Sequence, residues 1–262
     1  MNRAYAADGR AIAGGPAAAG DTTAAGGAAA AGGAENGVTA ASVAAEPAAD
    51  KNTPVPFAVL VSGNGTNLQA LLDAERSDRL GRGRVALVIS DRRGAYALER
   101  ARLAGKKALL IEADQNLPKE ARRRDLSDRI LAAVREAQAE FIVLAGFLSI
   151  LKGPILDTYR ERIINIHPSL LPKFGGPGMY GERVHQAVLA AGETVSGCTV
   201  HIVDQGTDTG PILLQRTVPV LPKDTPESLA ERIHHEEHIA IVDGVLELLS
   251  RLGNLDNRRA SS

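Results

Sequence analysis

The stretch FAVLVSGNGTNLQALLDA (57–74) decides the fold of this chain. Its first residues form a continuous apolar run, the pattern of a strand that is buried on both faces. The glycine-rich turn GNGTN (63–67) follows, and the residues after it carry leucines at helical spacing. We therefore predict a strand that turns directly into a helix, which is the first half of a parallel β-α-β unit.

The same alternation of apolar runs and helical patterns continues along the chain. Further strand patterns are VALVIS (85–90), KALLIE (107–112), FIVLAG (141–146) and RIINIH (162–167), with a charged helical segment at 119–139. Two neighbouring strands are predicted within 199–206 and 211–220, and Thr225-Pro226 begins a long helix predicted over 227–252. These patterns predict an α/β fold with a doubly wound, mostly parallel sheet and helices on both faces.

Residues 1–53 differ in composition from the rest of the chain. They are rich in Ala and Gly and nearly devoid of large apolar side chains, so we expect a disordered tail. An organellar transit peptide is the alternative, which the acidic residues scattered along the segment disfavour. We expect one catalytic domain over 54–253 and a flexible C-terminus over 254–262.

The charge of the chain is balanced, with 30 basic and 31 acidic groups. This balance argues against broad binding of nucleic acid or of an anionic membrane, while it permits a local phosphate pocket. No stretch reaches the roughly 20 apolar residues that cross a bilayer. Cys198 is the single cysteine, and no Cys/His cluster has zinc spacing, so we expect a cytoplasmic protein without a bound metal.

Three motifs fall at the carboxyl ends of predicted strands, where open parallel sheets bind their ligands. They are GNGTN after the first strand, AGFLSIL after the fourth and NIHP at the end of the fifth. GNGTN offers backbone N–H groups and a helix N-terminus to an anion. It lacks the third glycine of a dinucleotide fingerprint and the lysine of a P-loop, so a monophosphate is the better ligand prediction. An ordinary tight turn is the competing interpretation.

Asn165 and His167 of NIHP stand two residues apart and therefore on the same side of their strand. An amide can stabilise a developing oxyanion, and an imidazole can shuttle a proton near neutral pH. Asp208 lies in the loop VDQGTDTGP, where a carboxylate that faces the imidazole would raise its pKa and orient its proton. For each of these residues, a turn that satisfies its own backbone is the competing interpretation.

The remaining histidines are weaker candidates. His201 is flanked by Val200 and Ile202, as is typical of a core histidine or of one that supports a catalytic side chain. The segment HHEEH (234–238) places its first and last histidines on one helical face, but not in the order of a zinc protease. We therefore expect no metal there.

Taken together, the motifs resemble the signature blocks of the folate-dependent glycinamide ribonucleotide formyltransferase family. The blocks are VLVSGNGTNLQALLDA, VLAGFLSIL, INIHPSLLPKF and SGCTVHIVDQGTDTGPILLQ, and the likeness runs over 57–249. The resemblance implies a formyltransferase-type Rossmann-like fold. It also implies that 10-formyltetrahydrofolate donates a formyl group to the amine of 5'-phosphoribosylglycinamide in purine (IMP) synthesis. The expected partners are small-molecule substrates, and the chain is expected to be a monomer or a homodimer.

The resemblance assigns roles to particular residues. The implied catalytic residues are Asn165, His167 and Asp208, supported by His201. Those implied to bind the ribonucleotide are Gly65, Thr66, Asn67 and Glu237. The folate side is implied to consist of Arg124, Leu148, Ser149, Ile150, Leu151 and Asn165.

The chain departs from the family pattern in two places. The family commonly has Met-Arg where this chain has Leu148-Ser149, so a side-chain contact from that arginine is missing. The segment 174–185 is longer and richer in glycine than the common form, and we expect it to shape the mouth of the site differently.

Related enzymes and a different class of protein are the alternatives. A methionyl-tRNA formyltransferase is expected to carry a further C-terminal domain, and a formyltetrahydrofolate hydrolase a folded N-terminal domain that residues 1–53 cannot supply. A non-catalytic module that senses a nucleotide or phosphate would lack a catalytic residue, and none is missing. For the transferase we expect direct attack by the amine, with protonated His167 and Asn165 stabilising the oxyanion and Asp208 keeping His167 protonated.

Overall fold

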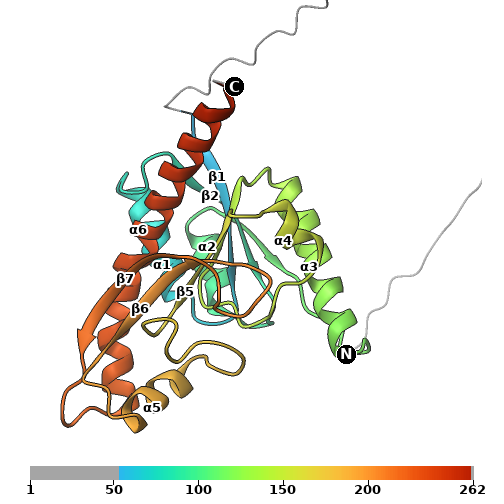
Figure 1. The fold of residues 1–262 in the computed structure, drawn as a ribbon. Coiled ribbons are helices and arrows are strands. Elements are labelled where there is room, and N and C mark those ends of the chain that lie inside the picture. The colour runs from blue at the N-terminus through green and yellow to red at the C-terminus, as the bar shows by residue number, and fades with distance from the viewer. Residues whose placement is uncertain (1–52, 261–262) are drawn as a thin grey trace, which may run out of the picture. The chain divides into compact units, whose positions relative to one another are not determined.

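A computed structural model describes residues 53–260, so nearly all of the tail predicted over 1–53 lies outside the described residues. The elements shown in Figure 1 are β1 (Val55–Val61), α1 (Thr66–Arg76), β2 (Gly83–Ser90), α2 (Tyr96–Leu103), β3 (Lys107–Leu110), α3 (Lys119–Glu136), β4 (Phe141–Leu144), α4 (Pro154–Thr158), β5 (Ile163–His167), α5 (Glu182–Ala190), β6 (Val195–Ile202), β7 (Ile212–Pro219) and α6 (Pro226–Ala260).

The strands form one sheet in the order β3-β2-β1-β4-β5-β6-β7. β1 to β5 run parallel to one another, whereas β6 and β7 pair antiparallel with their neighbours. The predicted α/β class with a mostly parallel sheet is confirmed. β2 and β3 lie on one side of β1, and β4 to β7 lie on the other side. The boundary between β1 and β4 is therefore the switch point at which such sheets bind ligands.

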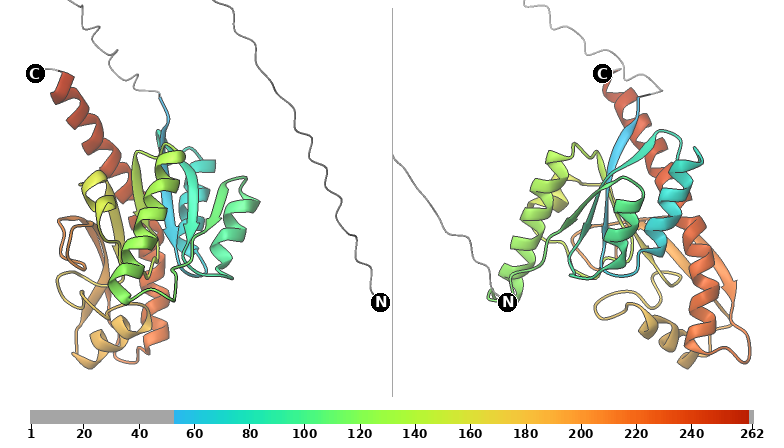
Figure 2. Two further views of the ribbon diagram at one scale, coloured as in Figure 1. Left: turned by 90° about the vertical axis from the view of Figure 1, so that its right-hand side faces the viewer. Right: turned by 180° about the vertical axis from the view of Figure 1, so that it is seen from behind.

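Helices cover both faces of this sheet (Figures 1 and 2). Phe57, Val59 and Val61 of β1 pack with α1, α2 and α6, whereas Ala58 and Leu60 pack with α3 and α4. Successive side chains of a strand point to opposite faces, and all five are fully buried here. Burial on both faces explains why β1 is apolar along its whole length.

The last helix, α6, is longer than the sequence predicts. Thr225 Oγ1 accepts a hydrogen bond from the Ser228 N–H at 3.3 Å, and Ser228 Oγ accepts one from the Thr225 N–H at 3.0 Å, which caps the helix as expected. The backbone then remains helical through Ala260, although the sequence predicts a flexible segment at 254–262. Gly253 weakens a helix by only about 1 kcal/mol, and no proline follows it.

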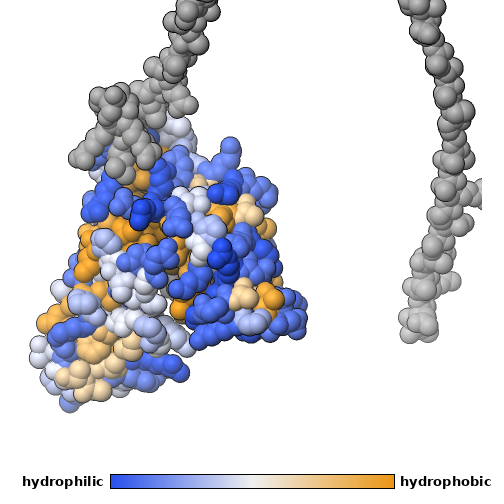
Figure 3. All heavy atoms as spheres, turned by 45° about the vertical axis from the view of Figure 1, so that its right-hand side comes forward, coloured by the Kyte–Doolittle hydropathy of each residue, from blue (hydrophilic) through white to orange (hydrophobic). Residues whose placement is uncertain are grey.

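Charged residues dominate the outer side of α3. Hydrophilic residues cover much of the surface on this side of the molecule (Figure 3), while Leu126, Ile130 and Val134 face the core. Among residues 53–260, no helix combines the length and the apolar character needed to cross a membrane.

Candidate active site

A cavity of about 1050 Å³ opens at the switch point between β1 and β4. Its walls include the segments that follow three parallel strands, namely 63–67, 144–151 and 165–168. The glycine-rich segment 176–181 and the loop 203–208 contribute the rest of the mouth. The three motifs at the predicted strand ends are therefore neighbours in space, and the volume exceeds what one drug-sized ligand fills.

The loop 63–67 is held in place by α2. Gly65, the N-cap of α1, adopts a left-handed φ of 76°, and a Cβ at this position would lie 2.5 Å from the Cβ of Ala97. Only glycine permits this approach. Arg100 donates to the backbone oxygen of Asn64 at 2.8 Å and to its side-chain oxygen at 3.2 Å. The first turn of α1, including Thr66, thus presents N–H groups without helical partners to the cavity, with a guanidinium beside the loop.

Asn67 and Glu237 form a buried pair at this end of the cavity. Asn67 Nδ2 donates to Glu237 Oε2 at 3.3 Å, and the two residues are 8% and 5% exposed. Burial raises the pKa of Glu237 to about 7, against the opposing effect of the Asn67 hydrogen bond. The resemblance implies that Asn67 binds the ribonucleotide; its amide nitrogen donates one hydrogen bond to Glu237, which leaves its second N–H and the backbone of the loop for a ligand.

Glu237→Gln is expected to stabilise the protein at alkaline pH relative to the original chain. The pKa of this carboxyl is near 4.5 in the unfolded chain and about 7 in the folded protein. Its contribution to the free energy of unfolding is therefore fully present below pH 4.5 and is lost as the pH rises through 7. A glutamine stays neutral and can still accept the bond from Asn67. Urea unfolding should show the advantage of the variant growing by on the order of 1–3 kcal/mol between pH 4.5 and pH 8.

The control for this comparison is Glu231→Gln, which removes an exposed carboxylate from the same helix. Its unfolding free energy should follow that of the original chain across the pH range. An equal pH dependence in Glu237→Gln and the original chain would contradict the buried, protonated state of Glu237.

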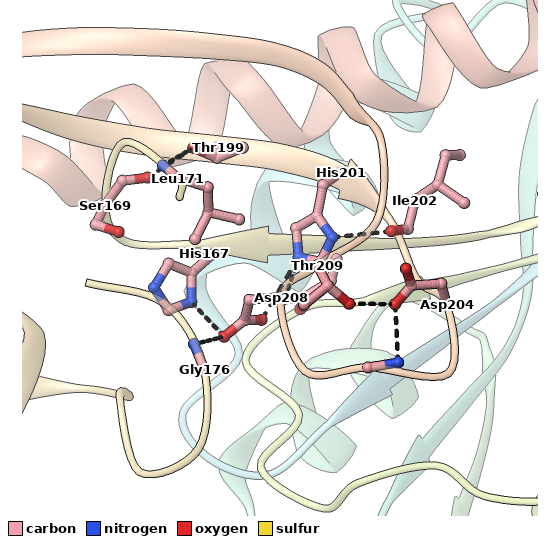
Figure 4. Close-up of polar contacts among 12 residues, drawn as sticks. His167, Ser169, Leu171, Gly176, Thr199, His201, Ile202, Asp204, Asp208 and Thr209 are labelled. Atoms are coloured by element: carbon pink, nitrogen blue, oxygen red, sulfur yellow. Dashed lines mark hydrogen bonds and ion pairs between the residues drawn. The ribbon is translucent and has the colours of Figure 1, made fainter. Parts of the chain in front are cut away.

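Asp208 lies between two imidazoles (Figure 4). Its Oδ2 is 3.5 Å from His167 Nδ1, its Oδ1 is 3.6 Å from His201 Nε2, and the Gly176 N–H donates to Oδ2 at 3.0 Å. Burial raises the pKa of Asp208, but its contacts with His201 and His167 and the hydrogen bond from the Gly176 N–H together outweigh burial and lower the pKa. The carboxylate is therefore ionised at neutral pH, and it also pins the glycine-rich segment at Gly176.

His167 is held at the end of β5 with both ring nitrogens in contact. Its Nε2–H donates to the carbonyl oxygen of Phe174 at 2.8 Å, which leaves Nδ1 facing Asp208. The sequence leads us to expect that Asp208 keeps His167 protonated, and Asp208 does raise the pKa of His167. Burial lowers the pKa of His167 by more than Asp208 and Phe174 raise it, because the ring is only 4% exposed. The neutral ring can accept a proton at Nδ1.

Asn165 and His201 face each other across the antiparallel pairing of β5 and β6. Asn165 Nδ2 donates to His201 Nε2 at 3.1 Å, and His201 Nδ1–H donates to the carbonyl oxygen of Ile202 at 2.9 Å. His201 is 2% exposed and contacts both Asn165 and Asp208. This arrangement leaves the second N–H of the Asn165 amide available to a ligand.

The predicted folate segment 148–151 lines the cavity. Leu148 is 41% exposed, whereas Leu151 is buried and Ile150 lies between these extremes. Ser149 directs its hydroxyl to Asp91, with Oγ donating to Oδ2 at 2.6 Å. The segment therefore offers an apolar wall, and its only hydroxyl is engaged by a residue that does not line the cavity.

Arg124, predicted on the folate side, does not line the cavity. It is exposed, and its guanidinium lies against Gly153. The neighbouring Arg122 and Arg123 line the cavity instead. Arg122 Nη1 donates to Gln115 Oε1 at 2.8 Å, and Arg123 Nη1 pairs with Glu120 Oε1 at 2.8 Å. Consecutive residues of a helix point in different directions, because the helix has about 3.6 residues per turn, so a shift of one or two positions decides which arginine faces the cavity.

His185 is a cavity residue that the sequence reasoning did not assign. It is 2% exposed, its Nδ1 has no hydrogen-bond partner, and its ring meets that of His234 edge-on with centroids 6.4 Å apart. Burial lowers its pKa to about 4. The available signal was its place with Val184 and Val188 on the buried face of α5.

The histidines of α6 do not converge on a metal site. Within residues 53–260, no three side chains of His, Cys, Asp or Glu are grouped so as to hold a metal ion. His235 is exposed, while His234 lines the cavity next to Glu237, with 3.9 Å between His234 Nε2 and Glu237 Oε2.

The chain is similar to several known proteins. Residues 55–245 match the model of a family described as formyl transferase. The chain is 48% identical over 185 residues to the trifunctional purine biosynthetic protein adenosine-3 of Drosophila pseudoobscura pseudoobscura, which covers 70% of this chain and 13% of that protein. It is 40% identical over 189 residues to the chloroplastic phosphoribosylglycinamide formyltransferase of Vigna unguiculata, which covers 72% of this chain and 59% of that protein. The chain thus spans less than two thirds of both relatives.

The crystal structure of glycinamide ribonucleotide transformylase 1 from Symbiobacterium toebii has a TM-score of 0.66 with this chain. The two are 43% identical, and the match covers 77% of this chain and 91% of the bacterial one.

Proposed function

The chain belongs to the formyl transferase family, and we propose that it transfers the formyl group of 10-formyltetrahydrofolate to the amine of 5'-phosphoribosylglycinamide in purine synthesis. The observation that carries this proposal is the placement of Asn165, His167 and Asp208 in one cavity, between an anion-binding loop and an apolar wall. The activities named for the Vigna unguiculata and Symbiobacterium toebii proteins support it.

The two substrates would occupy different parts of the cavity. The phosphate of the ribonucleotide would meet the backbone of Gly65, Thr66 and Asn67 at the start of α1, where the helix dipole favours a negative charge. Glu237, on the same side, would contact the sugar or amine end of that substrate. The folate would lie against 148–151, with Arg123 on α3 close enough to the cavity to meet its acidic end.

The reaction needs one proton to move from the attacking amine to the leaving nitrogen. The amine attacks the formyl carbon, and the free N–H of Asn165 stabilises the oxyanion that forms there. Neutral His167 takes the proton at Nδ1, and ionised Asp208 stabilises the resulting imidazolium across 3.5 Å. The proton then passes to N10 of the folate as the bond between that nitrogen and the formyl carbon breaks. No step requires a metal.

A coupled assay tests the proposal. Purified protein is mixed with the ribonucleotide and 10-formyltetrahydrofolate, and the formation of deformylated folate is followed with and without the amine substrate. We expect turnover only when the amine is present. Equal turnover without it would show a hydrolase, and no turnover in either mixture would contradict the proposed activity.

Gly65→Ala is expected to raise the KM for the ribonucleotide by about tenfold or more, with a smaller effect on the KM for the folate. The new Cβ would meet Ala97 Cβ at 2.5 Å while the backbone stays at a φ of 76°, so the loop 63–67 must shift. Steady-state kinetics with each substrate varied in turn measures the effect.

The matched control is Gly94→Ala, since Gly94 also has a positive φ, 80°, but a Cβ there would have no heavy atom within 4 Å. This variant shares the backbone strain without the crowding, and its ribonucleotide KM should stay within about threefold of the original. Equal changes of the ribonucleotide KM in the two variants would contradict the proposal that the loop 63–67 binds the phosphate.

We further propose a cytoplasmic enzyme that acts as a monomer or homodimer on small molecules, without nucleic acid, membrane or metal. The acidic residues within 1–53 support the cytoplasmic assignment over an organellar one, although the Vigna unguiculata relative carries a chloroplastic name. A fusion of residues 1–53 to a fluorescent protein would decide, because import into an organelle would contradict the assignment.

A further inference from the structure

The carboxylate of Asp91 joins two loops at the carboxyl end of the sheet. Asp91 follows β2, Ser62 follows β1, and Ser149 lies in the segment after β4. Ser62 Oγ donates to Asp91 Oδ1 at 2.6 Å, and Ser149 Oγ donates to Asp91 Oδ2 at 2.6 Å. Each carboxylate oxygen thus receives one short hydrogen bond, of the charge-assisted kind that is stronger than a neutral one. We call these three residues the Asp91 clamp.

Ser62 extends the clamp to the backbone of the cavity wall. The Leu148 N–H donates to Ser62 Oγ at 2.8 Å, and the Ser62 N–H donates to the carbonyl oxygen of Gly146 at 3.1 Å. Ser62 is 4% exposed, so these bonds are shielded from competing water. Together with the Ser149 hydroxyl, these two bonds attach the segment 146–149 to the clamp at the carbonyl oxygen of Gly146, the N–H of Leu148 and the side chain of Ser149.

The clamp stands behind the wall rather than in it. The segment 144–151 lines the cavity, whereas Asp91 and Ser62 do not. The nearby Arg93 is turned away and pairs with Glu112 at 3.0 Å. Asp91 therefore has no direct route to a ligand, and any influence on binding must pass through the conformation of the segment.

We propose that Asp91 is a positioning residue, which holds 146–151 through Ser62 and Ser149 in the conformation that receives the folate substrate. Preorganisation of a binding wall increases affinity because the ordering cost is met before the ligand arrives. The proposal explains how a serine serves at position 149, where the family commonly has an arginine: its short hydroxyl reaches Asp91. The identity of the ligand rests on the proposed function, while the clamp rests on the contacts alone.

The first test is steady-state kinetics of Asp91→Ala, Asp91→Asn, Ser149→Ala and the double variant Asp91→Ala/Ser149→Ala. Asp91→Ala should raise the KM for 10-formyltetrahydrofolate by about tenfold or more, the effect of losing hydrogen bonds to a charged group. Its kcat and its KM for the ribonucleotide should stay within about threefold. Asp91→Asn should recover most of the affinity, because an amide can accept from Ser62 and donate to Ser149 Oγ.

The double variant tests whether the two residues act as one unit. Once Asp91 is absent, the Ser149 hydroxyl has lost its acceptor, so the double variant should bind no more weakly than Asp91→Ala. Arg93→Ala, in the same loop, is the control and should change neither KM. Three outcomes would overturn the proposal. The first is a folate KM in the double variant that is raised by the product of the two single effects. The others are a fall in kcat without a change in folate KM, and an unchanged folate KM in Asp91→Ala.

A second measurement is independent of the activity. Hydrogen exchange in the absence of substrates should show faster exchange of the Leu148 amide in Ser149→Ala and in Asp91→Ala than in Arg93→Ala. Unchanged exchange at Leu148 would overturn the clamp even if the enzyme were active. Faster exchange in a protein without formyl transfer would instead leave the clamp standing and refute the proposed function. If Asp91→Ala does not fold, Ser149→Ala and Asp91→Asn carry both measurements.

Discussion

Asp208→Asn is expected to lower kcat by about 10²–10³ while both KM values stay close to those of the original chain. Asp208 lines the cavity between His167 and His201, so its loss should affect the proton transfer between the substrates more than their binding. An asparagine cannot balance the charge of an imidazolium at His167. An asparagine also puts a neutral amide in place of the carboxylate that accepts the hydrogen bond from the Gly176 N–H at 3.0 Å.

The measurement is the rate of formyl transfer at saturating concentrations of both substrates, with circular dichroism to verify the fold. The control is Asp204→Asn in the same loop. Asp204 Oδ1 accepts from the Gly206 N–H and from Thr209 Oγ1, and an asparagine oxygen can keep both bonds. This variant should retain kcat within about threefold, since only a charge away from the two imidazoles is lost. If Asp208→Asn retained kcat, the assignment of Asp208 would fail.

Gly210→Ala is expected to destabilise the protein by on the order of 2–4 kcal/mol and to lower kcat with it. Gly210 is buried where the catalytic loop meets β7, and a Cβ there would overlap the carbonyl oxygen of Ile202. The Ile202 N–H donates to the carbonyl oxygen of Pro211 at 2.8 Å. The backbone at Gly210 therefore cannot move away from Ile202 without breaking the pairing that begins β7. Any displacement is passed to Asp208, two residues away.

Urea unfolding and steady-state kinetics on the same preparation test this expectation. Gly253→Ala is the control, because Gly253 lies within α6 and a Cβ there would come no closer than 3.9 Å to Arg82. That substitution should stabilise the protein by about 0.5–1 kcal/mol, the difference in helix propensity between the two residues. Equal stability of Gly210→Ala and the original chain would show that the loop tolerates a side chain.

Repeating local patterns were sufficient to predict most of the fold. β1 and β4 are apolar along their whole length because both faces are covered, and that burial is visible in the sequence as an unbroken run. The separation of Asn165 and His167 by one residue places them on the same side of β5, so their proximity also follows from local geometry. The glycine-rich turn at 63–67 could also be predicted, because it is formed by consecutive residues.

The order of the strands and the ends of the elements were less accessible. Nothing local ends α6 before Ala260, and composition alone suggested an earlier stop. The apolar residues Leu126, Ile130 and Val134 give the phase of α3 in the sequence, but which of the three successive arginines meets the cavity depends on how α3 packs against the sheet.

Tertiary structure decided the protonation of the site and the supports behind it. The pKa of His167 is lowered mainly because the folded chain buries its ring, and burial by distant segments leaves no mark in a local pattern. Ser62, Asp91 and Ser149 come from three separate parts of the chain and meet only when β1, β2 and β4 lie side by side. Local sequence thus predicted which groups would carry the chemistry, because periodicity depends on near neighbours. Their charge states and their positioning depend on contacts between segments far apart, which only the folded chain establishes.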